Sequence, residues 1–399
     1  MKRAVFFLPC LLFAQDFSQR GFLETTAVLY PQTTANDASH AVGEGQFRYE
    51  AFYKAAPNLR FAGGIDLRGD THNETERAFG LSWWDRERQR PAFAVRRFSA
   101  TYTRGKLTIE AGKQFIRWGK ADILNPTDRF APRDFVNVVD NDFLGITAAR
   151  VSYGTQANTI ELVFSPRLTP SRIPLLNQRW AALPAGIPIG ELAPDFPGGT
   201  QFGGRWNHIG GVAEYSLSFY NGYDHLPLFR AVPEPASLGL ERFYPQMRMY
   251  GGDAAVPFAV LTVKAEAAYF TSGTPQADQY LLWVLQLERQ AGEWSFTGGY
   301  AGQAITAHGT AASFSPERGF TRALVARAGY IIDVNRSVAF ETVIRQNGRG
   351  IYVKPEYTQA VGQHWRITAG FALIRGASSD FLGQYRRNSH GILGLRYSF

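Results

Sequence analysis

The sequence predicts an all-β fold, a closed antiparallel transmembrane β-barrel of about 18 strands, with about 16 as the alternative count. Three observations predict it. Segments of about ten residues alternate apolar and polar side chains. Short and long connections alternate between these segments, and the chain ends on an aromatic residue, Phe399. The composition agrees, because 14% of the residues are aromatic, only 19% are charged and 40 are glycines, a mixture rich in strand and turn formers.

The start of the chain has the three parts of a secretory signal peptide. Lys2 and Arg3 supply a positive charge, residues 4–13 form an apolar run, and Ala14 is a small residue in a position suited to cleavage. The run is too short for a membrane-spanning helix. We therefore expect a signal peptide over residues 1–14 and a barrel domain over residues 15–399. The only cysteine, Cys10, lies in the signal, so no disulfide would stabilise the exported chain.

The strand pattern is clearest in residues 59–68, 261–269 and 365–373. Each segment places aliphatic or aromatic side chains on one face and charged or small ones on the other, over the length that a tilted strand needs to cross a bilayer. A soluble β-sandwich also alternates, but here the polar face carries full charges and aromatic residues lie near the strand ends. The residues expected to form an interfacial girdle are Tyr102, Tyr153, Tyr269, Trp294, Tyr300, Trp365 and Tyr397.

The connections fall into two kinds that alternate along the chain. The short ones are residues 55–58, 104–106, 154–157, 208–211, 255–258, 289–293, 332–335 and 358–363. The long ones are residues 32–43, 70–93, 117–144, 168–199, 223–244, 272–279, 303–319 and 376–385, with a tight one at 347–350. This alternation predicts short periplasmic turns and long extracellular loops, with both chain ends on the periplasmic side.

The last strand agrees independently with this topology. Gly394, Tyr397 and the terminal Phe399 resemble the C-terminal pattern of bacterial outer-membrane proteins, which the barrel-assembly machinery reads. Ile392 departs from that pattern, because a polar residue usually stands there. We therefore expect the protein in the outer membrane, with membrane lipid and the barrel-assembly machinery as partners.

A group of short motifs resembles certain porin-like barrels. Residues 112–119 read Gly-Lys-Gln-Phe-Ile-Arg-Trp-Gly, residues 125–128 read Asn-Pro-Thr-Asp, and Arg133-Asp134 follow. The sequence Gly-Tyr-Asp at residues 222–224 also fits. These motifs are similar to those of the alginate-export-like barrels and related uncharacterised families, with recognisable motifs over about a quarter of the chain and only a similar pattern over the rest. The resemblance implies an outer-membrane channel or export pore and implies no particular substrate.

Residues 117–144 are the first candidate for a loop that folds into the barrel. Trp118 is the large apolar anchor near its start, and Asn125-Pro126 fixes a turn, because proline restrains the residue before it. We expect this loop to narrow the lumen, with both charge signs at the constriction and Arg117 and Asp128 opposed across its narrowest point. The charged residues of the constriction are Arg117, Asp128, Arg133 and Asp134. The alternative is a surface loop held by local ion pairs, with Trp118 in the outer girdle.

A second long loop is another candidate for closing the barrel. Residues 168–199 contain Pro170, Pro174, Pro184, Pro188, Pro194 and Pro197 around Leu175, Leu176 and Trp180. Prolines at these positions stiffen the chain. The loop is a candidate lid or plug, and the alternative is an ordered cap.

The less apolar face of each strand is expected to line the lumen. The basic residues on these faces are Arg48, Lys54, Arg60, Arg68, Arg97, Lys264, Arg345, Arg366 and Arg396. The acidic ones are Glu50, Asp66, Glu110, Glu266 and Glu341. This basic excess, roughly two to one, favours anions by raising their local concentration. In the alternative interpretation these charges pair between neighbouring strands and hold the wall together.

No motif predicts catalysis, a metal site or a cofactor. The seven histidines are scattered without metal-ligand spacing, and Asp224-His225 is at most half of a catalytic group, which makes a barrel hydrolase a remote alternative. The basic residues form no block or stripe, so nucleic acid is not an expected partner. The expected function is a channel for passive passage of small anionic solutes or an acidic glycan. The alternative is a plugged barrel that serves as receptor, adhesin or assembly partner.

Overall fold

The computed structural model describes residues 16–182, 189–235, 237–346 and 350–399. The expected signal peptide lies outside these residues and stays a prediction, as does most of the predicted connection at 347–350. Among the described residues, no helix is both long and apolar enough to span a membrane.

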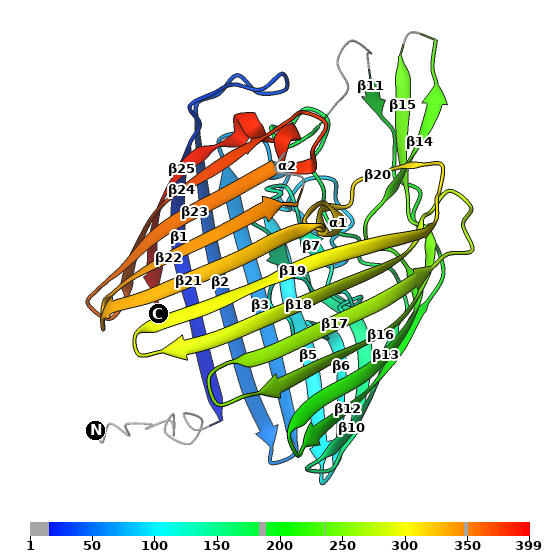
Figure 1. The fold of residues 1–399 in the computed structure, drawn as a ribbon, viewed down its shortest axis with the longest axis vertical. Helices are drawn as coiled ribbons and strands as arrows, with labels where there is room; N and C mark the ends of the chain where they lie inside the picture. The colour runs from blue at the N-terminus through cyan, green and yellow to red at the C-terminus, as the bar shows by residue number, and fades with distance from the viewer. Residues whose placement is uncertain (1–15, 183–188, 236, 347–349) are drawn as a thin grey trace, which may run out of the picture.

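One antiparallel sheet forms the whole wall and closes into a barrel where β1 pairs with β25 (Figure 1). The predicted fold class is confirmed, with 18 strands in the wall. These strands are β1 (Phe17–Leu29), β2 (Ala41–Ala56), β3 (Leu59–Asp70), β5 (Phe93–Arg104), β6 (Leu107–Gln114), β9 (Ile146–Gly154), β10 (Asn158–Ser165), β12 (Gln201–Gly210), β13 (Ala213–Tyr223), β16 (Gln246–Pro257), β17 (Thr262–Thr271), β18 (Gln279–Ala291), β19 (Trp294–Ala307), β21 (Ala323–Asp333), β22 (Arg336–Arg345), β23 (Gly350–Val361), β24 (Trp365–Gly376) and β25 (His390–Ser398).

Shorter elements lie in the long loops. They are β4 (Leu81–Ser82), β7 (Arg133–Asp134), β8 (Asp142–Phe143), β11 (Ile189–Glu191), β14 (Leu228–Pro233), β15 (Leu238–Phe243), β20 (Ala312–Ser313), α1 (Pro316–Gly319), α2 (Phe381–Gln384) and the 3-10 helix η1 (Arg386–Asn388). Strands β11, β15, β14 and β20 form a separate sheet, and the hairpin of β14 and β15 projects beyond the barrel rim (Figure 1). The sequence predicts a long connection at 223–244, but β14 and β15 form a short hairpin within it, beyond the strands that cross the wall.

Short and long connections lie at opposite ends of the barrel (Figure 1). For example, only Pro57 and Asn58 separate β2 from β3, whereas 31 residues, 115–145, separate β6 from β9. The described chain begins and ends at the same end as the short turns. This end corresponds to the periplasmic side in the predicted topology.

The outer surface of the wall is apolar. Leu162, Leu217 and Leu324 are each more than half exposed, and so is Tyr153 of the predicted girdle. Residues directly opposite in the register share a face, as Arg48 and Asp66 do on the inner side. Because an apolar band of this extent is favourable only against hydrocarbon, the barrel has the surface of a membrane protein.

Candidate functional site

The connection between β6 and β9, called the third loop below (residues 115–145), lies against the inner face of the wall. Near its start, the indole N–H of Trp118 donates to Glu161 of β10 at 2.5 Å, and Lys120 Nζ donates to Glu214 of β13 at 2.9 Å. Both carboxylates lie on strands whose alternate side chains are exposed on the outer surface, so they point inward. The loop therefore enters the barrel and does not run over its rim.

The later part of the third loop reaches the other side of the barrel. Val138 is fully buried with Tyr352 of β23 and Ile374 of β24. Asp140 Oδ2 lies 3.7 Å from Lys354 Nζ of β23. The loop thus contacts walls on both sides of the lumen and occupies part of it.

An apolar cluster holds the first part of the third loop in place. Trp118 is only 2% exposed and packs edge-on against Phe130, with ring centroids 5.3 Å apart. Phe130 packs in the same way on Tyr220 of β13 at 5.0 Å. The alternative that placed Trp118 in the lipid-facing girdle is therefore wrong. Trp118 is also not the only large apolar anchor, because Ile116 and Phe130 belong to the same buried cluster.

The Asn125-Pro126 pair forms a tight turn inside the barrel. The backbone N–H of Asp128 donates to the carbonyl of Asn125 at 3.2 Å, which places Pro126 at the second position of the turn, where its fixed φ is favourable. The Asn125 side chain also donates to the carbonyl of Ala121. The turn brings Thr127 and Asp128 back toward the start of the loop.

Arg117 and Asp128 do not oppose each other across a passage, so this prediction is wrong. The Arg117 Nε and Asp128 Oδ2 atoms are 3.5 Å apart, on the same side of the lumen. The reason is the turn at Pro126, which folds Asp128 onto the backbone N–H of Trp118 at 2.9 Å. Burial raises the pKa of Asp128 to about 6. The Arg117 guanidinium lies 4.0 Å above the Phe143 ring.

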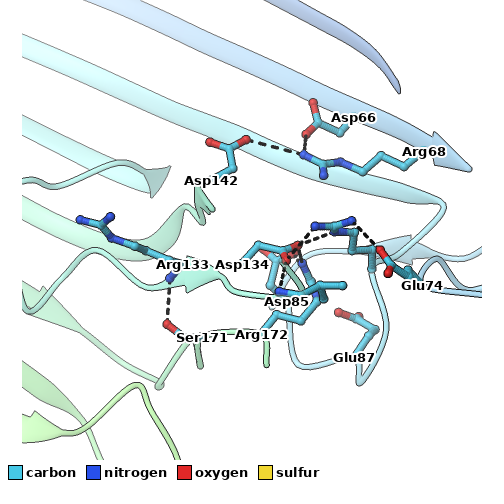
Figure 2. Close-up of polar contacts among 12 residues, drawn as sticks. Asp66, Arg68, Glu74, Asp85, Glu87, Arg133, Asp134, Asp142, Ser171 and Arg172 are labelled. Atoms are coloured by element: carbon cyan, nitrogen blue, oxygen red, sulfur yellow. Dashed lines mark hydrogen bonds and ion pairs between the residues drawn. The ribbon is translucent and has the colours of Figure 1, made fainter. Parts of the chain in front are cut away.

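Asp134 belongs to a buried ion network that joins three loops (Figure 2). Its carboxylate lies 3.0 Å from Arg90 and 2.8 Å from Arg172. Arg90 also reaches Glu74 at 3.2 Å, and Arg172 reaches Asp85 at 3.4 Å. Burial alone would raise the pKa of Asp134, but the two arginines outweigh it and hold that pKa well below its usual value. Asp134 therefore fixes the loops at one side of the mouth and is not free to contact a solute.

Arg133 has a different environment from its neighbour Asp134. Its guanidinium lies 4.3 Å from the centroid of the Phe143 ring and donates to Asn141 at 3.1 Å. Among the described residues, no carboxylate lies within 4.0 Å of it. Its backbone N–H donates to Ser171 of the next long loop at 2.8 Å (Figure 2).

The connection between β10 and β12, called the fourth loop (residues 166–200), also turns inward. The Arg179 guanidinium lies 3.7 Å from the centroid of the Tyr30 ring, pairs with Asp37 at 3.1 Å and donates to the carbonyl of Arg387 at 3.4 Å. Trp180 is buried beside it. The described part of the fourth loop therefore crosses from β10 to the region around β1 and β25, as a strap over the mouth.

The histidine that motivated the hydrolase alternative is enclosed. His225 Nδ1 lies 2.8 Å from Ser171 Oγ, but both side chains are buried. Burial lowers the pKa of His225 to about 3. Asp224 accepts the backbone N–H of Leu226 and is not aligned with the imidazole by any hydrogen bond among the described residues. The contact between His225 and Ser171 joins two loops. The described residues also contain no group of three or more histidine, cysteine or acidic side chains arranged for a metal ion.

Several of the predicted lumen-lining basic residues are neutralised by ion pairs. Arg48 lies 2.7 Å from Asp66 and 2.9 Å from Asp142, and Arg68 lies 3.3 Å and 3.6 Å from the same two residues (Figure 2 shows Arg68). The predicted basic excess did not count carboxylates of the loops, such as Asp142. Arg96 shares the same two carboxylates, at 3.8 Å from Asp66 and 2.9 Å from Asp142, so ion pairs occupy three arginines in this part of the lumen.

Two further basic residues on the list are also paired. Arg345 lies 3.1 Å from Asp380, and Lys264 lies 3.0 Å from Asp122 and 2.5 Å from Glu288. Asp380 and Asp122 are again loop residues. These charges are therefore paired, but only Lys264–Glu288 joins neighbouring strands as the alternative interpretation expected, and the other partners come from the loops.

A second set of basic residues has no such partner. Arg60, Arg97 and Arg366 lie on the inner face of β3, β5 and β24, and no carboxylate of the described chain is within 4.0 Å of them. The same holds for Lys54, which is exposed opposite Arg60 near the short-turn end of the barrel. Lys54, Arg60 and Arg366 therefore place positive charge near that end, whereas Arg97 lies farther along the wall, opposite Gly64.

Two adjoining cavities mark the open part of the lumen. One has a volume of about 610 Å³ and the other about 290 Å³, and both are lined by Asp122, Arg327 and Glu341. They lie between the third loop and strands β17–β23. On the loop side Asp122 and Asp140 are 60% and 58% exposed, and on the wall side Arg327 is 64% exposed. The loop thus presents carboxylates to this space, whereas the wall presents both signs, because Arg327 pairs with Glu341 at 2.8 Å.

The C-terminal residues occupy the seam of the barrel. Tyr397 and Gly394 of β25 pair with Leu23 and Thr26 of β1. The backbone N–H of Phe399 donates to the carbonyl of Gly21 at 3.0 Å, and the Phe399 ring is exposed on the outer surface. The residues predicted as an assembly signal therefore close the barrel and present an aromatic side chain to its surroundings.

A closed antiparallel barrel of 18 strands with a long loop folded into its lumen has the fold of outer-membrane porins. The structure is similar to Acinetobacter baumannii OccAB4, with a TM-score of 0.57 and 10% identity over 96% of this chain and 98% of that chain. It is similar to a BenF-like porin from Pseudomonas fluorescens Pf-5, with a TM-score of 0.56 and 10% identity over 97% and 99% of the two chains. It is also similar to Pseudomonas aeruginosa OccK2 (OpdF), solved in complex with glucuronate, with a TM-score of 0.53 and 8% identity over 97% of each chain.

No family model and no curated protein sequence matches this chain. The solved structures are too distant in sequence to show more than a shared fold. The resemblance of residues 112–134 to alginate-export-like barrels is accordingly not supported by these comparisons.

Proposed function

We propose that the protein is a porin-like channel of the outer membrane that passes small polar solutes without chemical change. The observation that carries this proposal is the pair of adjoining cavities beside the third loop, which share Asp122, Arg327 and Glu341. A channel needs an inner face that is polar and not filled by side chains, and this part of the lumen has both properties. The described fold, shared with porins, agrees with this function.

Small anions, including sugar acids or an acidic glycan, are the proposed preferred solutes. Arg60, Arg97 and Arg366 carry positive charge on the inner face with no described carboxylate beside them. Unpaired charge of one sign raises the local concentration of the opposite ion. The glucuronate bound to OccK2 shows that a barrel of this fold can bind such a solute. Because the charges around the cavities are mixed, the preference is expected to be mild.

The proposed partners follow from the wall and the seam. The apolar outer surface would be embedded in outer-membrane lipid. Gly394, Tyr397 and Phe399 would be read by the barrel-assembly machinery, since they form the last strand and its exposed aromatic end.

A planar-bilayer recording in a salt gradient tests the proposal. We expect the purified barrel to conduct in discrete steps. We also expect its reversal potential to be displaced toward the equilibrium potential of the anion. Heat-modifiable migration on a gel provides the control that the sample is a folded barrel. A folded barrel without conductance would contradict the channel function.

One observation favours a second candidate function. The third loop contacts both sides of the lumen, the described part of the fourth loop crosses the mouth, and the hairpin of β14 and β15 projects from the rim (Figure 1). A barrel plugged in this way could act as a receptor or adhesin through its projecting sheet. In that case the folded barrel would not conduct, so the same recording separates the two functions.

A further inference from the structure

Glu266 of β17 occupies an unusual position on the inner wall. Its side chain is 2% exposed and points at the third loop. Its carboxylate accepts the backbone N–H of Thr127 at 2.8 Å and the hydroxyl of Thr127 at 2.8 Å. It also accepts the backbone N–H of Lys120 at 3.1 Å and of Ala121 at 3.3 Å. One wall carboxylate thus binds both ends of the loop segment 120–127.

These loop donors are the only partners that Glu266 has among the described residues. No lysine, arginine or histidine of the described chain lies within 4.0 Å of its carboxylate. A buried carboxylate is costly unless hydrogen bonds replace its hydration, and hydrogen bonds to a charged acceptor are about twice as strong as neutral ones. The loop and the carboxylate therefore depend on each other: an undocked loop leaves Glu266 without partners, and a lost carboxylate leaves the loop donors unsatisfied.

The loop is shaped to approach this carboxylate. Gly119 has a φ of +90°, a conformation that side chains other than glycine rarely adopt. A Cβ atom at residue 119 would lie 2.5 Å from Glu266 Oε2. Glycine is therefore required here both by the backbone conformation and by the closeness of Glu266.

A second wall residue extends the same attachment. Gln286 Oε1 of β18 accepts the backbone N–H of Asp122 at 2.8 Å and of Ile123 at 3.0 Å. The amide nitrogen of Gln286 donates to the Asp122 carboxylate at 2.8 Å. Asp122 and Ile123 are the loop residues that line both cavities. The attachment therefore fixes the edge of the loop that borders the open part of the lumen.

We propose that Glu266 is a latch that holds the third loop against the wall and so sets the width of the passage. It is a positioning residue, because it acts through the loop and does not itself line the described cavities. Gln286 assists it by fixing Asp122. This inference rests on the proposed channel function.

Two variants release the latch from opposite sides. Glu266→Ala removes the acceptor from the wall, and Gly119→Ala adds a Cβ atom where the carboxylate must lie. We expect both to raise the single-channel conductance roughly twofold or more and to admit larger sugars in liposome-swelling assays, because the loop edge leaves the conducting cross-section. Glu110→Gln is the matched control, since Glu110 is a buried inner carboxylate on β6 that pairs with Arg150 and Ser99 and not with the loop. It should conduct like the parent.

The outcomes separate the latch from the channel function. A folded parent barrel that does not conduct overturns the proposed function, whatever the variants do. A conducting parent with Glu266→Ala and Gly119→Ala barrels of unchanged conductance overturns the latch. If Glu266→Ala yields no folded barrel, the conductance of the Gly119→Ala barrel alone decides. Trypsin cleavage at Lys120 in the folded Gly119→Ala barrel, but not in the parent barrel, also supports the latch.

Discussion

Two parts of the inner wall differ in what they present to the lumen. Strands β16–β18 carry Met249, Phe270 and Leu282 on their inner faces, and these side chains are buried in one cluster with the first part of the third loop. Strands β21 and β22 carry Arg327 and Glu341, which line the open cavities. The loop-facing side chains of β16–β18 form a docking surface, whereas β21 and β22, together with Lys264 and Glu288 near the short-turn ends of β17 and β18, line an open cavity. The comparison shows that inward-facing apolar residues decide where the loop lies, and so where the passage remains.

The largest expected effect comes from removing the main anchor of the docking surface. Trp118→Ala should weaken docking of the third loop by about 3–5 kcal/mol, the usual cost of deleting a buried tryptophan. Its hydrogen bond to Glu161 and its contact with Phe130 are lost together. Single-channel recording should show a larger and noisier conductance. If the variant is folded and conducts like the parent, the third loop does not limit the passage.

An intermediate effect is expected from charge substitutions in the two kinds of wall. Replacing Arg60, Arg97 and Arg366 by serine should move the reversal potential toward cations, because no described carboxylate neutralises them. Replacing Arg48 and Arg68 should instead mainly lower the melting temperature, because Asp66 and Asp142 would each keep only Arg96 as an ion-pair partner. Reversal potentials in a salt gradient and thermal melts in detergent measure the two effects. Equal shifts of the reversal potential in both sets would show that ion pairing does not shield the second group.

The smallest expected effect is a dependence on pH. Burial raises the pKa of Asp128, and also that of Asp224, to about 6, above the value of a solvated carboxyl. The docked loops therefore bind protons more tightly than displaced loops do, so docking is strengthened as the pH falls and weakened as it rises through about 6. Asp134 has the opposite shift, and its contribution is lost only in more acidic solution.

We therefore expect conductance and current noise to decrease between pH 7.5 and pH 5, a range chosen to span these pKa values. Asp128→Asn should reduce this dependence, since the amide does not titrate. A pH dependence that is identical in the variant would show that Asp128 is not responsible for it.

Much of the wall could be predicted from the sequence, because alternation and turn composition are local. The strand at residues 59–68, for example, was placed correctly with its inner and outer faces. The docking surface was harder to predict. Residues 280–285 read Tyr-Leu-Leu-Trp-Val-Leu, apolar on both faces, and this run indicates a strand with lipid on one side and a buried partner on the other.

The contacts of the third loop could not be predicted. Its inward position was expected from Trp118 and the turn at Pro126, but the partner of Trp118 is Glu161, and the partner of Thr127 is Glu266 of a strand far along the chain. Pairings over such sequence distances depend on the closed barrel and on the register of its strands. For the same reason the sequence placed Arg117 and Asp128 on opposite sides of the passage, although the turn brings them together.

The strap formed by Arg179 has a consequence for the order in which the molecule folds. Its partners Tyr30 and Arg387 belong to the loops that follow β1 and precede β25, the first and last strands of the wall. They become neighbours only when these two strands join. The fourth loop can therefore lock only after the seam has closed, and a protease that cuts this loop would report barrels in which the last step of assembly is incomplete.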